Sequence, residues 1–242
     1  MKYIFSLIVI NIMTLSLFSQ EVPSIDRVST PNGPVEMHFI GHGSLMFKLN
    51  NTVVYVDPVR SMGNYKDLPK ADMILITHEH GDHLDPSLIN DLKKESTDVL
   101  CNALSTPSVP GAITISPGSE FTGNGVSIEA VYAYNMKNVR NDGTPYHPKG
   151  DGNGYVITLG GKRIYVAGDT ENIPEMKELK NIDIAFLPMN LPYTMTPAMV
   201  ADAAKSFSPS ILYPYHFGNT NTDEIVNLLK DSGIEVRIRN LQ

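Results

Sequence analysis

The amino-acid sequence predicts a layered α/β fold, classed as α+β in some schemes, and three observations lead to this prediction. Strand-like apolar runs dominate residues 35–77. From residue 126 onward, strand-like runs alternate with segments of helical periodicity. The 242 residues are 42% hydrophobic and 19% charged, which is typical of a soluble globular protein and excludes a disordered chain. We found no repeat, low-complexity tract or obvious linker, so a single domain is the simplest expectation.

Four strands are expected in the first half of the chain. The runs at 35–41 and 44–50 meet at a Gly-His-Gly corner. An Asn-Asn pair separates the second run from the next one, at 52–58, which is typical of a tight hairpin turn. The run at 71–77 is apolar through its centre, as expected of a strand that is buried on both faces.

The second half of the chain also contains strand-like apolar runs, and segments of helical periodicity lie between them. Helices are indicated where a capping residue opens a periodic segment: Asp85 before Pro86, Thr196 before Pro197, and Thr222. The expected helices cover 85–94, 196–206 and 222–231. The expected strands cover 126–134, 154–160, 162–168, 182–189 and 210–216.

A long polar stretch from Asn135 to Asn153 interrupts these elements. Glycine and proline break it repeatedly before the chain becomes apolar again. A loop of this length inside a compact domain is more often functional than idle, so we expect it to contribute to a site.

Residues 1–20 have the layout of a secretory signal peptide. Lys2 supplies the positive start, and an apolar run from Tyr3 to Phe18 follows. The run contains Asn11 and is shorter than the ~20 apolar residues that a transmembrane helix needs. We therefore expect a periplasmic or secreted protein whose mature domain, residues 21–242, has no transmembrane span.

The charge balance and the cysteine content exclude several classes of function. The chain has 19 Lys and Arg against 26 Asp and Glu, a formal net charge of -7. An acidic surface does not attract a polyphosphate backbone, so a nucleic-acid partner is disfavoured. The single cysteine, Cys101, excludes an intrachain disulfide and a cysteine-rich zinc module, and its apolar neighbours indicate a buried side chain. The oligomeric state leaves no mark in the sequence.

The densest cluster of metal-binding residue types follows the expected strand 71–77 directly. Three histidines and two acids lie within the six residues His78-Glu79-His80-Gly81-Asp82-His83. A short turn lets the alternating His78 and His80 point to one ion, and Gly81 permits a bend that aims Asp82 and His83 elsewhere. Imidazole and carboxylate together suit zinc, iron or manganese.

The string HxHxDH formed by these residues resembles the signature of the metallo-β-lactamase fold superfamily. The resemblance covers nearly the whole mature chain. It implies two sheets packed face to face with helices on both outer faces, a four-layer αββα sandwich, and metals in a groove at one sheet edge. The AGDT, HPKG and PYHFG segments are most similar to the metal-dependent hydrolase branch, which includes ascorbate-phosphate lactonase-like and N-acyl-phosphatidylethanolamine phospholipase D-like proteins.

The resemblance extends the expected ligand set beyond the HxHxDH string. Asp169 follows the expected strand 162–168, where the family places its metal-bridging aspartate. His216 ends the expected strand 210–216, where the family places its last histidine ligand.

One departure from the family pattern concerns the first metal site. The family usually has a further histidine ligand shortly after the strand that is 126–134 here, but this chain reads Ala133-Tyr134-Asn135. His147 can supply the missing imidazole from the long loop, or Asn135 can serve as a weak oxygen ligand. Ligand chemistry favours His147.

Four further residues are expected around the metals. Asp57, at the end of a strand, is a candidate to fix the tautomer of a histidine ligand, although a strand-end turn explains it equally well. His42 resembles the histidine of an N-terminal turn that lies near the metals in the same branch. Lys149 indicates a cationic lip suited to a phosphate or carboxylate substrate, and Tyr193 a pocket wall.

The expected function is that of a metal-dependent hydrolase with two divalent ions, zinc first, with manganese or iron as alternatives. Two neighbouring metals lower the pKa of a shared water toward ~7, which gives hydroxide at neutral pH. This hydroxide would attack an ester-type bond, such as a phosphoester or lactone, in a small or lipid-like substrate. Asp82 would orient the hydroxide and shuttle its proton. The rival hypotheses are a non-catalytic metal- or ligand-binding protein of the same fold and a nuclease of this fold.

Overall fold

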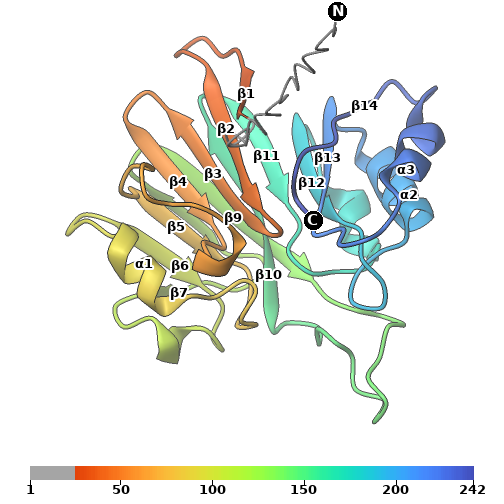
Figure 1. Ribbon diagram of the computed structural model, residues 1–242, viewed down its shortest axis with the longest axis horizontal. Helices are drawn as coiled ribbons and strands as arrows, with labels where there is room; N and C mark the ends of the chain where they lie inside the picture. The colour runs from red at the N-terminus through yellow and green to blue at the C-terminus, as the bar shows by residue number, and fades with distance from the viewer. Residues whose placement is uncertain (1–24) are drawn as a thin grey trace, which may run out of the picture.

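The computed structural model describes residues 25–242, so the expected signal peptide at 1–20 lies outside the described residues. These residues form two seven-stranded sheets that pack face to face (Figure 1). Helices cover the outer face of each sheet, which confirms the expected α/β sandwich. Within the described range, no helix is long and apolar enough to cross a membrane.

The first sheet has its strands in sequence order. β1 to β4 are antiparallel neighbours, whereas β4 to β7 pair in parallel. The strands are β1 (Ile25–Val28), β2 (Val35–Gly41), β3 (Ser44–Leu49), β4 (Thr52–Val56), β5 (Met73–Ile76), β6 (Asp98–Cys101) and β7 (Ile113–Thr114).

The second sheet repeats this arrangement. β8 to β11 are antiparallel neighbours, and β11 to β14 pair in parallel. The strands are β8 (Glu120–Gly123), β9 (Val126–Ala133), β10 (Gly152–Leu159), β11 (Lys162–Val166), β12 (Ile184–Pro188), β13 (Ile211–Tyr215) and β14 (Glu235–Val236).

In the described part of the chain, three α-helices and three short 3-10 helices connect the strands. α1 joins β5 to β6, α2 joins β12 to β13, and α3 joins β13 to β14. These crossovers follow from the parallel pairing, which a tight hairpin cannot connect. The helices are α1 (Pro86–Leu92), α2 (Pro197–Phe207), α3 (Thr222–Leu229), η1 (Arg60–Met62), η2 (Thr106–Ser108) and η3 (Pro174–Glu178).

Alternation along the strands divides the apolar side chains between two cores. In β5, Met73 and Leu75 face the second sheet, whereas Ile74 and Ile76 face α1. Phe186 of β12 lies in the inter-sheet core, with its ring centroid 5.6 Å from that of Phe47 and 4.9 Å from that of Tyr213. In this region both faces of both sheets are therefore covered by packed side chains.

The structure confirms all the expected strands and helices, and it adds short ones. Asp85 caps α1 as predicted, since its side chain accepts a hydrogen bond from Leu88 N. Asn221, not Thr222, caps α3, because its side chain accepts from Asp223 N. Five strands of two to four residues were not expected from the sequence; they are β1, β6, β7, β8 and β14. Cys101 is fully buried in β6, as expected.

The topology brings the chemical residues to one edge. The carboxyl ends of β4 and β5 and of β11, β12 and β13 all belong to the parallel parts of their sheets. At this edge the two sheets are joined by hydrogen bonds: Asn153 N donates to Thr77 O at 2.8 Å, and the Tyr155 hydroxyl donates to Ile76 O at 2.7 Å. Loops that follow these strands converge in the same place.

Candidate metal centre

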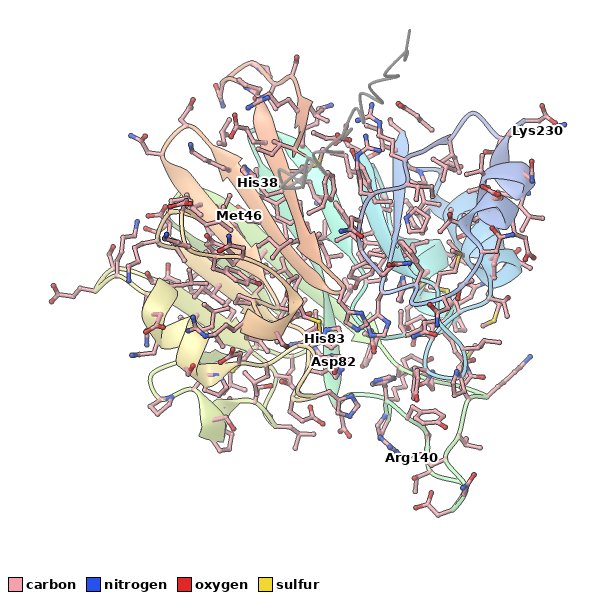
Figure 2. All side chains as sticks on the ribbon, in the orientation of Figure 1. His38, Met46, Asp82, His83, Arg140 and Lys230 are labelled. Carbon is pink, nitrogen blue, oxygen red and sulfur yellow. The ribbon has the colours of Figure 1, made fainter. Side chains whose placement is uncertain are left out.

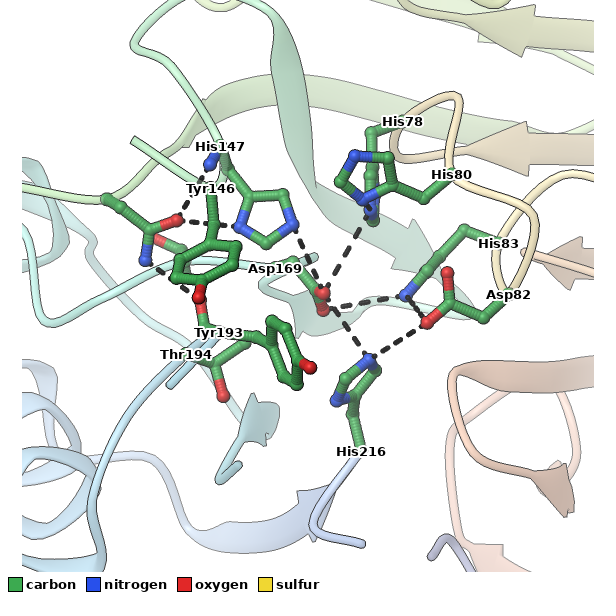
Figure 3. Close-up of polar contacts among 12 residues, drawn as sticks. His78, His80, Asp82, His83, Tyr146, His147, Asp169, Tyr193, Thr194 and His216 are labelled. Carbon is green, nitrogen blue, oxygen red and sulfur yellow. Dashed lines mark hydrogen bonds and ion pairs between the residues drawn. The ribbon is translucent and has the colours of Figure 1, made fainter. Parts of the chain in front are cut away.

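Six histidines and two aspartates gather where these strand-end loops meet (Figure 3). The turn after β5 supplies four of them, and the turns after β11 and β13 supply one each. The long loop between β9 and β10 and the β2–β3 corner supply the rest. The residues are His42, His78, His80, Asp82, His83, His147, Asp169 and His216.

The Asp169 carboxylate lies at the middle of this cluster. Its Oδ2 is 3.3 Å from His216 Nε2 and 3.4 Å from His147 Nε2. Its Oδ1 is 3.6 Å from His83 Nε2. His78 Nε2 lies 4.0 Å from Oδ2. Imidazoles from both sheets therefore point at a single buried carboxylate.

Two groups of donors flank Asp169. On one side, the donor atoms of His78, His80 and His147 lie within 4.8 Å of one another. On the other side, Asp82 Oδ2 lies 3.5 Å from His216 Nε2, 3.9 Å from His83 Nε2 and 3.3 Å from His42 Nε2. The HxHxDH string is divided as predicted: His78 and His80 lie on one side of Asp169, and Asp82 and His83 lie on the other.

Strained backbone helps to aim these side chains. His42, Asp57 and His216 have φ angles of 51°, 44° and 48°, which non-glycine residues seldom adopt. Each follows the end of a strand directly, at β2, β4 and β13. Such conformations persist only where the surroundings stabilise them, and they concentrate at functional sites.

Asp57 fixes the orientation of His83. Its carboxylate is fully buried, and Oδ2 lies 2.8 Å from His83 Nδ1. Thr77 donates its backbone N–H to Oδ1 at 2.8 Å and its hydroxyl to Oδ2 at 2.6 Å. Because Nδ1 of His83 is held by the carboxylate, Nε2 faces Asp169. Asp57 therefore makes the contact that was expected of an orienting carboxylate.

The same threonine orients His78. Since the Thr77 hydroxyl gives its hydrogen to Asp57, its oxygen accepts one from His78 Nδ1, which lies 3.0 Å away. The proton on Nδ1 directs the Nε2 lone pair of His78 into the cluster, where His80 Nδ1 lies 3.1 Å away and Asp169 Oδ2 lies 4.0 Å away. Sequence reasoning missed Thr77, although it directly precedes the cluster.

Asn135 and His147 are paired with each other. The side-chain Oδ1 of Asn135 accepts hydrogen bonds from His147 Nδ1 at 2.7 Å and from His147 N at 2.8 Å. Asn135 N also donates to His147 O at 2.8 Å. The structure thus brings the His147 Nε2 to Asp169 and places the Asn135 amide behind the imidazole, where its oxygen is already occupied.

Several buried polar atoms at the centre have no hydrogen-bond partner among residues 25–242. They are His83 Nε2, Asp169 Oδ1, and both ring nitrogens of His216. Leaving such groups unpaired is costly inside a protein. A metal ion would satisfy nitrogen and carboxylate oxygen together, so the residues fit the divalent metals that their donor set predicts.

The protonation states also suit metal binding. Burial lowers the pKa of His147 to about 4 and that of His78 well below its usual range, which leaves both imidazoles neutral at pH 7. Burial opposes a charge on His83, but the carboxylates of Asp169 and Asp57 outweigh it and raise its pKa to about 9. A potential negative enough to keep a proton on His83 also favours a metal cation.

A pocket of about 490 Å³ opens in front of the centre. Its walls include Tyr193, as expected, together with Arg140, Tyr146 and Asn190. The rings of Tyr146 and Tyr193 meet edge to face, with centroids 5.1 Å apart. Sequence reasoning missed these three residues; the position of Tyr146 next to His147 was the available signal.

The structure does not bring Lys149 to this pocket. Its ammonium lies 2.6 Å from Glu175 Oε1 and 4.8 Å from the ring centroids of both Tyr132 and Tyr134. The expected cationic lip is corrected accordingly: a carboxylate and two aromatic faces hold the lysine at the base of the long loop, away from the centre.

Comparisons with known proteins are consistent with this geometry. Residues 36–216 match the family described as Beta-lactamase superfamily domain. A UPF0173 metal-dependent hydrolase of Listeria innocua is 32% identical, with 76% of this chain and 85% of that protein aligned. One from Thermus thermophilus is 30% identical over 76% of this chain and 84% of its own length.

Solved structures show the same fold. A crystal structure of a protein from Parabacteroides distasonis superposes with a TM-score of 0.87. It is 49% identical and covers 91% of this chain and all (100%) of that one. The metallo hydrolase Igni18 from Ignicoccus hospitalis has a TM-score of 0.69 at 22% identity, over 86% of this chain and 95% of its own, and shares the fold.

Gly168 precedes Asp169 and provides a test of how the centre is positioned. Its φ is +66°, and a Cβ there would lie 2.7 Å from the Asn153 carbonyl oxygen. Gly161 also has a positive φ, +82°, but a Cβ there would meet nothing within 4 Å. An alanine at either position would meet the same backbone strain, but only an alanine at Gly168 would also collide with a neighbouring atom. Comparing the two substitutions therefore isolates the effect of the steric contact.

We expect Gly168→Ala to reduce the free energy of unfolding by about 1–3 kcal/mol more than Gly161→Ala does, because only the first overpacks the sheet junction. Urea denaturation of both variants measures the difference. Metal content measured by mass spectrometry should fall for Gly168→Ala alone. Equal stability and equal metal content would show that Gly168 does not position Asp169.

Proposed function

This chain belongs to the β-lactamase superfamily and is a metal-dependent hydrolase of the metallo-β-lactamase fold, and on this premise we propose that it cleaves an ester-type bond with a dinuclear metal centre. The observation that carries the proposal is the position of Asp169. Its carboxylate lies between two groups of donors, with His147 on one side and His216 on the other. A carboxylate flanked in this way suits a ligand shared by two ions.

In this proposal each group of donors holds one divalent ion. His78, His80 and His147 would hold the first, Asp82, His83 and His216 would hold the second, and Asp169 would be available to both. Zinc is the first choice, and manganese or iron are alternatives. When bound, the ions would supply Lewis acidity for the substrate and a water acidic enough to provide the nucleophile at neutral pH.

The protein's own residues contribute orientation. Asp57 and Asn135 hold the Nδ1 atoms of His83 and His147, so each ring keeps its Nε2 toward Asp169. Such contacts to the far nitrogen of a ligating histidine typically raise metal affinity ten- to a hundredfold, that is by about 1–3 kcal/mol. His42 approaches Asp82 with Nε2, while its Nδ1 lies 3.0 Å from the Gln242 carbonyl oxygen.

Asp82 is the proposed catalytic residue. Its side chain is 39% exposed, whereas those of His83, His216 and Asp169 are nearly inaccessible. It lines the pocket, so it can reach both the nucleophile and the substrate. Although burial opposes its charge, the neighbouring imidazoles of His216 and His42 hold the pKa of Asp82 below its usual range. An ionised carboxylate at this position can orient the attacking water and receive its proton.

The substrate of this proposal is small or lipid-like and lies outside the cytoplasm, as the predicted export requires. The pocket volume of about 490 Å³ matches a small molecule. Four exposed apolar side chains support an acyl or aromatic portion, because they lie on the two segments that flank the pocket. They are Met136, Val139, Leu191 and Tyr193, with exposed fractions of 43%, 45%, 51% and 44%. Hydrogen bonds from Asn135 and Asn138 join these two segments.

The test is hydrolysis by residues 21–242, loaded with zinc or manganese, against phosphodiesters, phosphomonoesters, lactones, thioesters and β-lactams. We expect turnover of one ester class that a chelator abolishes. Turnover that survives complete metal removal would contradict the proposal. With two ions bound, inactivity on every class, including acyl-chain esters, would favour the non-catalytic binding protein of this fold. Chelation would then lower only the melting temperature.

Asp82→Ala should abolish turnover while leaving the protein folded, because the side chain is partly exposed and its loss removes the proton acceptor. Asp67→Ala is a matched control, since this aspartate is exposed and lies outside the pocket lining. Circular dichroism and metal analysis accompany the rate measurement. Near-normal hydrolysis by Asp82→Ala with its metals retained would exclude the residue from the mechanism.

His147→Ala should lose about one metal equivalent, because the proposal gives this imidazole to one ion only. Asn135→Ala, which removes only the side chain behind the ring, should keep both ions with a weaker affinity. Equilibrium dialysis of zinc measures both. Full occupancy in His147→Ala, with loss in Asn135→Ala, would transfer the ligand role to the asparagine.

A further inference from the structure

We propose that Arg140 is the anion-binding residue of the pocket, and that the substrate therefore carries a phosphate or carboxylate group. This inference rests on the proposed function and narrows its substrate class. In this inference Arg140, and not Lys149, supplies the positive charge at the entrance of the pocket, because the Lys149 ammonium is held elsewhere.

Arg140 occupies a defined place on the pocket wall. It lines the same cavity as Asp82, Asp169 and His216. A small hairpin at the tip of the long loop fixes its backbone, because Arg140 N donates to Thr144 O at 2.7 Å. Gly143 N donates back to Arg140 O at 3.0 Å. Figure 2 shows Arg140 on this loop, which projects beyond the sheets on the side of Asp82 and His83.

The guanidinium of Arg140 has no carboxylate partner. The sequence contains six arginines, all within the described residues 25–242. The other five pair with an acid: Arg27 with Glu36, Arg60 with Asp91, Arg163 with Glu129, Arg237 with Asp26 and Glu235, and Arg239 with Asp26. Across residues 25–242, no carboxylate oxygen lies within 4.0 Å of the Arg140 guanidinium.

The nearest acid in the sequence is engaged elsewhere. Asp142 accepts from Thr144 N at 3.0 Å and from the Thr144 hydroxyl at 2.6 Å, so its Oδ1 belongs to the turn. Asp82 and Asp169, which share the pocket with Arg140, face the imidazoles instead. Among the six arginines, all within residues 25–242, Arg140 is therefore the one that forms no ion pair within 4.0 Å, and the Asp142 carboxylate acts on it only at longer range.

Aromatic contacts hold the guanidinium while leaving donors free. Its Cζ lies 5.0 Å from the Tyr146 ring centroid, and one Nη donates to Tyr146 O at 3.2 Å. Tyr146 in turn packs against Tyr193. Stacking on an aromatic face does not use the N–H groups, so the planar fork can still bind two oxygens of a carboxylate or phosphate.

The position of the charge distinguishes Arg140 from the metals. The chain has a formal net charge of -7, and two aspartates line the pocket itself. The bound ions would attract an anion to the reacting end of the pocket. Arg140 supplies a second positive charge on the pocket wall, which can hold a charged group of the substrate apart from the ester.

The first experiment measures binding by titration calorimetry. Inorganic phosphate and succinate are titrated into the zinc-loaded wild type, Arg140→Gln, and the control Lys137→Gln, which removes an exposed charge from the same loop outside the pocket lining. Loss of one charge-assisted bidentate partner should weaken binding of at least one anion by about tenfold to a hundredfold. The control should bind like the wild type, and Arg140→Lys should recover binding only in part.

Unchanged affinity of Arg140→Gln for both anions overturns the inference. A loss seen only with phosphate assigns a phosphate-bearing substrate, and a loss seen only with succinate assigns a carboxylate. Because this readout does not require turnover, an inactive enzyme with Arg140-dependent anion binding would refute the proposed function and leave this inference standing.

A second experiment uses two esters with the same leaving group, 4-nitrophenyl butyrate and mono-4-nitrophenyl glutarate, which differ by a terminal carboxylate. Arg140→Gln should raise KM for the charged ester by about tenfold and leave kcat and the neutral ester unaffected. Equal effects on both esters would make Arg140 a structural residue of the loop and overturn the inference.

Discussion

The buried hydrogen bonds around the Asp57 carboxylate are the constraint on which the rest of the centre depends. Asp57 directly follows β4 and Thr77 directly follows β5, so two parallel neighbours are joined at the edge where the chemistry lies. A fully buried carboxylate is stable only when its oxygens are satisfied, and Thr77 and His83 satisfy them. Through Thr77 the same set also fixes His78. A single acid therefore orients two of the three histidines in the turn after β5.

The second sheet contributes in a different way. Gly168 and His216 both adopt left-handed backbone after parallel strands, which turns the chain sharply at the sheet edge. Asp169 thereby reaches the imidazoles that the first sheet presents. The metal-binding groups of one sheet are complete only against the carboxylate of the other.

The strands and the first ligands were largely predictable from the sequence, because both depend on local patterns. Strand-like apolar runs located β2 to β5, and the residues of the HxHxDH string follow β5 with no intervening element. The four-layer arrangement and the roles of Asp169 and His216 were expected from the family resemblance instead. Short edge strands such as β7 and β14 were not predictable, since two residues carry no period.

The residues that line the pocket were the least predictable from sequence. Lys149 and Arg140 are both exposed cations on one polar loop, and nothing in the sequence says which of them faces the centre. That depends on long-range contacts: Glu175 holds the lysine, and the arginine lacks such a partner within the described chain. The sequence likewise did not indicate that His147 and Asn135 hydrogen-bond to each other, with the imidazole toward Asp169 and the asparagine behind it.

The paired hydrogen bonds between Asn135 and His147 also close the long loop at its base. The intervening residues 136–146 leave and return through this clasp, so their length and sequence can change without displacing the imidazole. Surface loops with anchored ends tolerate insertion and substitution far better than packed elements do. Substitutions within residues 136–146 can thus change which substrate such an enzyme recognises without changing its metal-binding residues. The hydrogen bonds between Asn135 and His147 separate the two parts of the site.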